Sequence, residues 1–196
     1  MESKVWNLKS IMSVLRWRSL VLFLVLVVGW FFLWGAPTAL AGLEDDRFDG
    51  NIFALYAGNG SLVPPKINLS NSLKGERPSL LFLYAEDSSD CKQFSSVISR
   101  LQAYYGRVSD FIPISIDAIP PKFDYEQTDP GYYYQGFVPQ TVIFDQAGKV
   151  VLNETGQISY EQIDDVLRQV FDLLPRSESI ELKRRPVNEV NVELVP

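Results

Sequence analysis

The residues that could carry covalent chemistry in this chain are few. Its 196 residues include one cysteine, Cys91, and no histidine. Without histidine the chain cannot form a Ser-His-Asp or Cys-His nucleophile system, nor offer a histidine ligand to a metal. A single cysteine excludes a disulfide within the chain, a zinc site built from thiolates and an iron–sulfur site. We therefore expect no cofactor and no metal, and what remains is the chemistry of one thiol.

The neighbours of Cys91 do not clearly activate it. Ser88 precedes it by three residues, and Asp90 is adjacent to it. A serine hydroxyl needs a nearby base to attack a substrate, and none is evident. The carboxylate of Asp90 disfavours a thiolate, whereas a helix N-terminus favours one, and the sequence does not decide between them. Cys91 is therefore either a small buried apolar residue or a thiol that forms a mixed disulfide with a partner.

The distribution of charge excludes one class of partner. The chain has 18 Lys and Arg residues against 24 Asp and Glu residues, which gives a net charge of −6. Residues 1–18 contain four basic residues and one acidic residue, so the remainder is more acidic still. Phosphate contacts need a basic surface, and we expect no nucleic-acid partner.

Two elements must position Ser88 and Cys91. Residues 79–84 form a continuous apolar run of strand length, typical of a strand covered on both faces. A helix follows, which Ser88 or Asp87 can cap, and its apolar residues recur every three or four positions. Gly106 marks its expected end.

The other elements predict an α/β sandwich around a mixed sheet. A strand, a helix and a second buried strand imply a right-handed crossover and a parallel pair, and a closing hairpin implies antiparallel neighbours. The remaining expected elements are strands at 51–56 and 62–69 joined by the turn Asn59-Gly60, a loop at 73–78, a strand at 111–116, a long connection at 117–136, strands at 141–144 and 149–152, and a helix from Ser159 to Pro175 with capping-box spacing.

The N-terminal region predicts a membrane segment. Residues 20–34 contain no polar side chain, and Gly35 and Ala36 extend the run enough to span a bilayer core of ~30 Å. The basic residues before the run and the acidic residues after it place the N-terminus in the cytoplasm or stroma. Residues 39–42 also fit a signal-peptidase site, which leaves a cleaved signal as the alternative to a retained anchor.

These observations divide the chain into five parts. We expect a basic N-terminal stub at 1–18, a transmembrane anchor or signal segment at 19–41, a linker at 42–50, a folded domain at 51–175 and a charged tail at 176–196.

Two segments carry a family resemblance. Residues 83–92 resemble the active-site segment of thioredoxins, in which a strand leads through aromatic-Ala-Glu to a Trp-Cys-x-x-Cys-Lys motif that opens a helix. Residues 138–141 resemble the family's cis-proline segment, and residues 73–78 resemble a loop of membrane-anchored thiol:disulfide interchange proteins. The resemblance covers about residues 51–174. It implies a thioredoxin-like fold, with a central mixed sheet flanked by helices, preceded here by one N-terminal transmembrane helix.

The departures from the family pattern argue against turnover. The attacking cysteine of the family falls on Ser88, its preceding tryptophan on Asp87 and its buried acid on Phe82, whereas the second cysteine is kept as Cys91. Dithiol exchange needs an attacking thiolate and a second thiol that releases the mixed disulfide. We therefore expect no thiol–disulfide oxidoreductase activity.

The resemblance also implies a surface that binds client segments. The peptide bond before Pro139 is expected to be cis, and Val138 would offer its backbone groups to an extended peptide by β-augmentation. Tyr132, Tyr133 and Tyr134 lie in a connection longer than the matching stretch of thioredoxins. Tyrosine is enriched at interface hot spots, so these rings either contact a client or cover the edge of the sheet.

The layout of the whole chain resembles cyanobacterial thioredoxin-like proteins assigned as photosystem I accumulation factors. The resemblance implies a non-enzymatic assembly factor in the thylakoid or plasma membrane, single-pass, with its domain in the lumen or periplasm. Its partners would be the membrane and assembly intermediates of a photosystem or another membrane protein. The alternative is a single-thiol redox protein, in which Cys91 forms a mixed disulfide with a partner.

Overall fold

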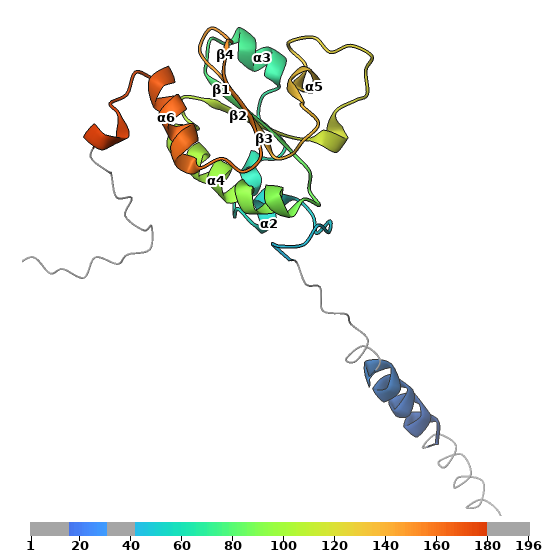
Figure 1. Cartoon of the computed structure of the whole chain (residues 1–196). Helices are drawn as coiled ribbons and strands as arrows, with labels where there is room; N and C mark the ends of the chain where they lie inside the picture. The colour runs from blue at the N-terminus through green and yellow to red at the C-terminus, as the bar shows by residue number, and fades with distance from the viewer. Residues whose placement is uncertain (1–15, 31–41, 180–196) are drawn as a thin grey trace, which may run out of the picture. The chain divides into compact units, whose positions relative to one another are not determined.

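The computed structural model describes residues 16–30 and 42–179 of the chain. It divides into two compact units at Ala41 and Gly42, each of which is described by itself. Residues 16–30 are helical and are drawn in blue in Figure 1. Residues 1–15, 31–41 and 180–196 lie outside the described residues, and with them most of the stub predicted at 1–18, part of the segment predicted at 19–41 and most of the tail predicted at 176–196. No helix in the two described ranges is both long and apolar enough to cross a bilayer.

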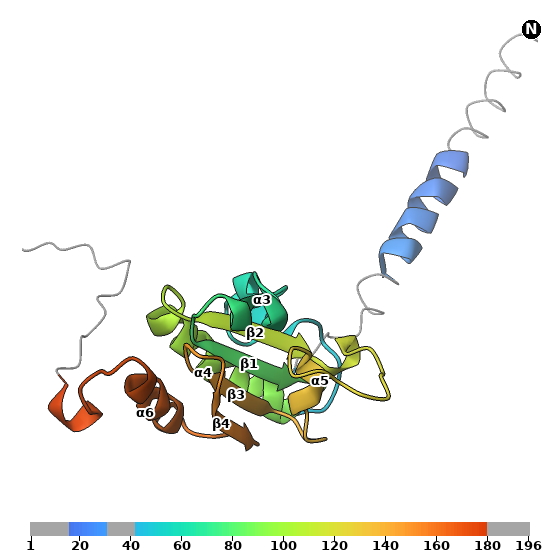
Figure 2. The same cartoon turned by 90° about the horizontal axis from the view of Figure 1, so that it is seen from above.

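The second unit is built on a four-stranded sheet in the order β2-β1-β3-β4. The strands are β1 (Ser79–Tyr84), β2 (Asp110–Ser115), β3 (Gln140–Phe144) and β4 (Val150–Thr155). Strand β1 runs parallel to β2 and antiparallel to β3, and β3 pairs antiparallel with β4 (Figure 2). The predicted mixed sheet with a parallel pair and a closing hairpin is therefore confirmed.

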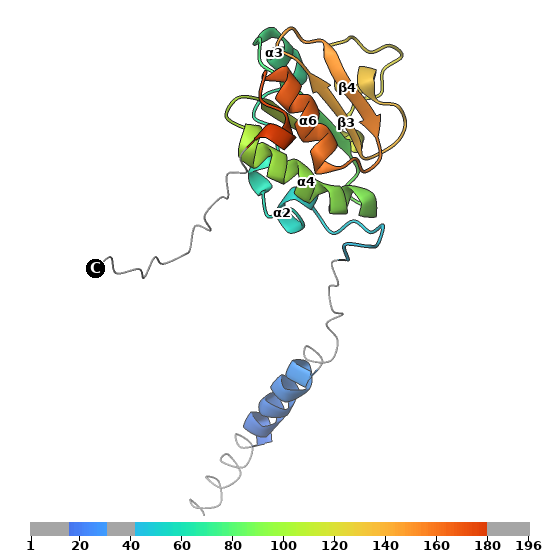
Figure 3. The ribbon, with the colours of Figure 1, turned by 60° about the vertical axis from the view of Figure 1, so that its left-hand side comes forward.

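Helices cover both faces of this sheet. The helices are α2 (Ile52–Leu55), α3 (Leu69–Lys74), α4 (Ser89–Tyr105), α5 (Pro130–Tyr133) and α6 (Tyr160–Val170), with 3₁₀ turns at Gly60–Leu62, Ile116–Ala118 and Arg176–Glu178. Alternate residues of β1 separate the two layers, because Phe82 packs with residues of α2, α4 and α6 whereas Leu81 packs with residues of α3. Figure 3 shows α2, α4 and α6 grouped on one face.

Local sequence explains the two long helices. The hydroxyl of Ser88 accepts a hydrogen bond from the backbone N–H of Cys91 at 3.3 Å and caps α4, which ends at Gly106 as predicted. At α6, Ser159 and Gln162 form the predicted capping box. Strand β1 is fully buried, as its unbroken apolar run predicted.

The predicted N-terminal hairpin is wrong. Residues 51–56 do not form a strand, because the side chain of Asn51 accepts hydrogen bonds from two backbone N–H groups and caps α2 instead. Gly60 begins a 3₁₀ turn, and residues 62–69 do not pair with a strand. Asn68 caps α3, which occupies the start of the loop predicted at 73–78. Asn51 and Asn68 thus act as N-cap residues, and asparagine is favoured both at helix N-caps and in turns, so its presence alone did not decide between them.

Two boundaries also differ from expectation. Strand β4 continues to Thr155 rather than ending at Leu152, because β3 keeps pairing with it. Helix α6 ends at Val170, and Asp172 takes a left-handed conformation with φ of 51°, so the chain leaves the helix before Pro175.

Candidate functional site

The first turn of α4 holds the two residues at the motif positions. Ser88 is the N-cap residue, partly exposed, and its hydroxyl is engaged with the backbone of Cys91. The side chain of Cys91 is fully buried in the core cluster that also contains Phe82. An attacking group must reach solvent, so this arrangement presents no exposed sulfur.

Burial raises the pKa of the Cys91 thiol above its ordinary value. The hydrogen bond with Ser88 opposes this rise, and the nearby carboxylate of Asp90 adds to it. The balance that the sequence left open therefore favours the protonated thiol. A protonated, buried thiol is neither a nucleophile nor a metal ligand at neutral pH.

The position of the family's buried acid is filled by aromatic packing. The ring of Phe82 stacks on that of Tyr84 at 5.7 Å and meets those of Phe53 and Phe94 at 5.9 and 5.7 Å. Burial and the charge of Glu86 raise the pKa of Tyr84 to about 12. Neither residue can relay a proton to Cys91 near neutral pH.

The proline segment lies at the same end of the sheet as Cys91. Leu83 pairs with Gln140, so Pro139 continues antiparallel beside the end of β1 that leads into α4. The Val138–Pro139 bond is cis, as expected. Val138 packs partly buried against the core that contains Cys91. Within the described residues, neither backbone polar group of Val138 makes a backbone–backbone hydrogen bond.

The three tyrosines do not share one role. Tyr133 packs edge to face on Phe144 with ring centroids 5.0 Å apart, and Tyr134 packs in the same cluster, so both cover the sheet. Tyr132 is 50% exposed and Phe137 is 71% exposed. Phe123, in the same connection, is also fully exposed. The exposed rings of this connection therefore include Tyr132, Phe123 and Phe137, of which the sequence analysis singled out only Tyr132 as a site residue.

The sequence analysis also missed Lys92. Its side chain is fully buried, although it lies beside Cys91 at the start of α4. The ammonium Nζ contacts five oxygens of the segment 42–49, which we call the strap. These are the carbonyl oxygens of Gly42, Asp45 and Arg47 at 3.2, 2.9 and 2.7 Å, and the carboxylates of Asp45 and Asp49 at 3.4 and 2.8 Å.

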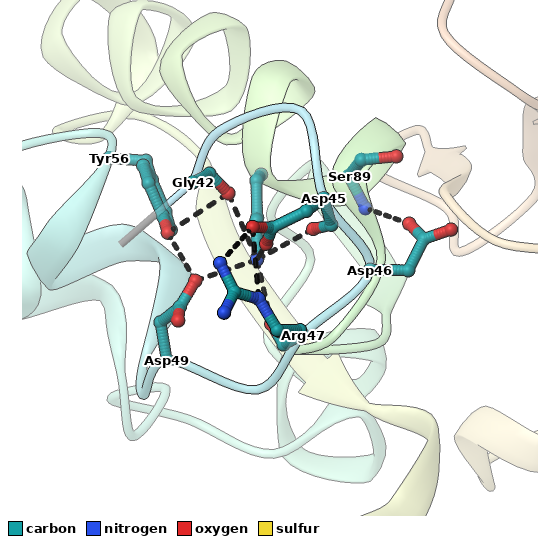
Figure 4. A network of polar contacts seen from close by, with 8 residues as sticks. Gly42, Asp45, Asp46, Arg47, Asp49, Tyr56 and Ser89 are labelled. Carbon is teal, nitrogen blue, oxygen red and sulfur yellow. Dashed lines mark hydrogen bonds and ion pairs between the residues drawn. The ribbon is translucent and has the colours of Figure 1, made fainter. Parts of the chain in front are cut away.

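The strap is fastened to both ends of the first turn of α4. The carboxylate of Asp46 accepts a hydrogen bond from the backbone N–H of Ser89 at 2.8 Å, three residues before Lys92 in the helix. Figure 4 shows the strap residues gathered over this turn. Burial alone would lower the pKa of Lys92, but the hydrogen bonds to Asp49 and Asp45 raise it, so the ammonium stays charged. The only sequence signal was the cluster of acids that we interpreted as a linker.

No group of three or more candidate metal-binding side chains occurs in the described ranges 16–30 and 42–179.

The comparisons with known proteins agree with the fold. The chain is 56% identical over 158 residues to the thylakoid membrane protein slr1796 of Synechocystis sp., a match that covers 81% of this chain and 79% of that protein.

Three solved structures match parts of the chain, each with a TM-score below 0.5. A mutant thioredoxin from Halobacterium salinarum is 19% identical, with a TM-score of 0.42 over 53% of this chain and 83% of its own. The germline-specific thioredoxin Deadhead of Drosophila melanogaster is 20% identical, with a TM-score of 0.38 over 48% and 81%. A malarial protein is 13% identical, with a TM-score of 0.39 over 47% and 96%.

A family model described as a thioredoxin-like domain matches residues 68–171, which is more than half of the chain. That segment contains β1 to β4 and the helices α4 and α6 that flank them. On this match, and on the identity with the Synechocystis protein, the chain belongs to the thioredoxin-like family.

Proposed function

We propose that this protein is a membrane-anchored, redox-inactive thioredoxin-like protein that binds client segments during assembly of a photosynthetic membrane complex. The observation that carries the proposal is the state of Cys91, which is fully buried with a raised pKa behind a serine at the attacking position. A scaffold in this state lacks the exposed thiolate that exchange requires, and what it retains is a binding surface.

The proposed client site lies beside Pro139. The backbone groups of Val138 can pair with an extended segment, and the exposed ring of Tyr132 lies a few residues before them in the chain. Main-chain pairing supplies affinity in this mode of recognition, and side-chain contacts supply specificity. The connection from Ile116 to Pro139 thereby becomes the rim of the site.

The membrane location is supported from two sides. Residues 20–36 are long enough, as an apolar run, to serve as an anchor. The 56% identical relative is named a thylakoid membrane protein. We therefore place this protein in the thylakoid membrane with its N-terminus cytoplasmic and the domain in the lumen, and we take photosystem I as the complex that it helps to accumulate, on the resemblance described above.

A Cys91→Ser variant of the full chain tests the proposal. Expressed in a strain that lacks the protein, it should restore photosystem I to the wild-type level, because the thiol takes no part in binding. Membrane fractionation and the amount of folded protein are the controls. Loss of photosystem I with the variant folded and membrane-bound would overturn the proposal in favour of a single-thiol redox protein.

The client site is tested by a matched pair of tyrosine variants. Tyr132 and Tyr104 are 50% and 52% exposed, and Tyr104 lies near the far end of α4. We expect Tyr132→Ser to reduce capture of photosystem I subunits from detergent-solubilised thylakoids by about tenfold, a typical hot-spot effect, and Tyr104→Ser to leave it unchanged. Equal capture by both variants would remove Tyr132 from the site.

A further inference from the structure

The strap leaves little slack between the domain and the chain that precedes it. Its first residue, Gly42, is held by Lys92 through a hydrogen bond of 3.2 Å to its carbonyl oxygen. The apolar run ends at Ala36, six residues earlier. A chain extends at most about 3.6 Å per residue, so a linker of six residues can reach no further than about 22 Å. Asp46 and Asp49 join the strap in turn to the start of α4, through Ser89 and Lys92.

Exposed apolar side chains flank the same place. Leu43 and Phe48 lie in the strap and are 44% and 69% exposed, and Leu55 in α2 is 51% exposed. The hydroxyl of Tyr56, the residue after Leu55, donates a hydrogen bond of 2.6 Å to Asp49 and so joins α2 to the strap. Strap and α2 thus form one surface, which we call the strap face.

Three of the four carboxylates of the strap are engaged within the domain, whereas the fourth, that of Glu44, belongs to an exposed residue. Asp49 bonds to Lys92, Asp46 bonds to the backbone of Ser89, and Asp45 bonds to Arg47 and Lys92. Carboxylates engaged in this way are already partly compensated, while the apolar side chains keep their contact with solvent. Exposed apolar side chains beside acidic groups that are mostly, but not all, paired suit the boundary of a bilayer whose headgroups carry no net charge better than one with anionic headgroups, which would repel Glu44.

We propose that the strap face lies on the lipid bilayer, so that the first turn of α4 and the client site beside Pro139 open toward the membrane surface. The inference rests on the membrane anchoring proposed above and adds an orientation to it. A client would then be captured where it leaves the bilayer rather than in the aqueous lumen. The partner surface is a zwitterionic or uncharged lipid headgroup layer.

Quenching of a fluorescent probe by brominated lipid tests the orientation in the full chain. In a Cys91→Ala background, Phe48→Cys and Leu55→Cys are each labelled with bimane and reconstituted into phosphatidylcholine vesicles. The control site is Val108→Cys, because Val108 is 50% exposed and follows the far end of α4. A helix of 17 residues is about 25 Å long, which takes the control beyond the reach of bilayer quenchers.

We expect brominated phosphatidylcholine to quench the two strap-face probes at least about twofold and to leave the Val108 probe unchanged, because only the former enter the interface. Weak quenching at both strap-face sites, or equal quenching at Val108, would overturn the orientation. Flotation of the same samples separates this from failure of the anchor. A chain that does not float with the vesicles contradicts the anchoring itself, whereas a floating chain without quenching contradicts the orientation alone.

Discussion

Cys91 shows how a residue's surroundings outweigh its position on a helix. It lies in the first turn of α4, where the positive end of the helix dipole favours a thiolate. Its side chain is nevertheless enclosed in the core, and burial raises the pKa of the thiol. Burial therefore outweighs the hydrogen bond with Ser88, which by itself would lower the pKa of the thiol.

The reactivity of Cys91 should therefore follow its burial. We expect iodoacetamide to alkylate the folded chain at least about 100-fold more slowly than the urea-unfolded chain. Because the pKa is raised above 9.0, the rate should rise about tenfold per pH unit from pH 7 up to that value. Mass spectrometry of quenched samples measures both quantities. A rate that levels off near pH 7 would indicate an activated thiolate and contradict the structure.

The sequence predicted the structural role of a site residue only where that residue belonged to a recognisable motif. Ser88 as the cap and Pro139 as a cis proline were both predicted. The sequence could not show that Tyr133 packs on Phe144 while Tyr132 stays exposed. Adjacent tyrosines carry the same signal in the sequence, and only the folded chain distinguishes their surroundings.

At the scale of elements, Lys92 makes the strap part of the domain. A buried ammonium requires oxygen partners, and here the strap provides them. The segment has no regular secondary structure of its own, so its conformation depends on this side chain.

Replacing Lys92 with methionine should release the strap. We expect trypsin to cleave after Arg47, within the strap, at least about tenfold faster in the Lys92→Met variant, because cleavage follows local opening. Cleavage after Arg100, inside α4, should stay at the wild-type rate if the helix remains folded. Lys149→Met, at an exposed lysine, is the matched control. An unchanged rate after Arg47 would show that the strap holds without Lys92.

The elements differ in how far sequence could predict them. Strand β1 and helices α4 and α6 carry long, consistent patterns with caps, and these were predicted within a residue or two of their ends, except that α6 ends at Val170, before the predicted stop at Pro175. Helix α2 has four residues, too few to show a period, and only its capping by Asn51 distinguishes it from a strand. The strap depends on contacts between residues 43 to 50 positions apart, for which no local pattern exists.

For the whole molecule, the buried carboxylate of Asp164 connects α6 with the C-terminal end of α4 and with the turn after α6. Asp164 in α6 accepts hydrogen bonds from Tyr105 of α4 at 2.6 Å and from Arg168 at 2.7 Å, and Arg176 lies 3.2 Å away. Burial alone would raise the pKa of Asp164, but the bonds from Tyr105 and Arg168 lower it overall. A carboxyl whose pKa is lower in the folded state stabilises the fold when ionised.

Stability should therefore fall with acid in a way that depends on Asp164. Its contribution is complete above the unfolded pKa of 3.8 and is lost as the pH falls through the lower folded value. We expect Asp164→Asn to reduce the free energy of unfolding by about 1–3 kcal/mol at pH 7 and by less at pH 3, measured by urea denaturation. Asp165→Asn, at an exposed neighbour, should change it little at either pH. If Asp164→Asn reduced the free energy of unfolding equally at pH 7 and at pH 3, the charge of Asp164 would not be what stabilises the fold.

The order of elements was enough to predict the class of fold, because a strand, helix and strand followed by a hairpin leaves few topologies. The position of the strap face could not be inferred in this way. It depends on Leu55 of α2, which the sequence analysis placed in a strand.

The ring of Phe82 restricts what a single reversion could restore. Changing Ser88 back to cysteine would return a second sulfur to the chain, but no group at the centre of the sheet could pass a proton to it. Supplying such a group would mean replacing Phe82 with an acidic residue. This substitution would put a carboxylate among the rings of Phe53, Tyr84 and Phe94, where an unpaired charge is costly to bury. Ser88→Cys alone would therefore supply a pair of thiols without a proton relay, whereas adding the relay at position 82 would destabilise the fold.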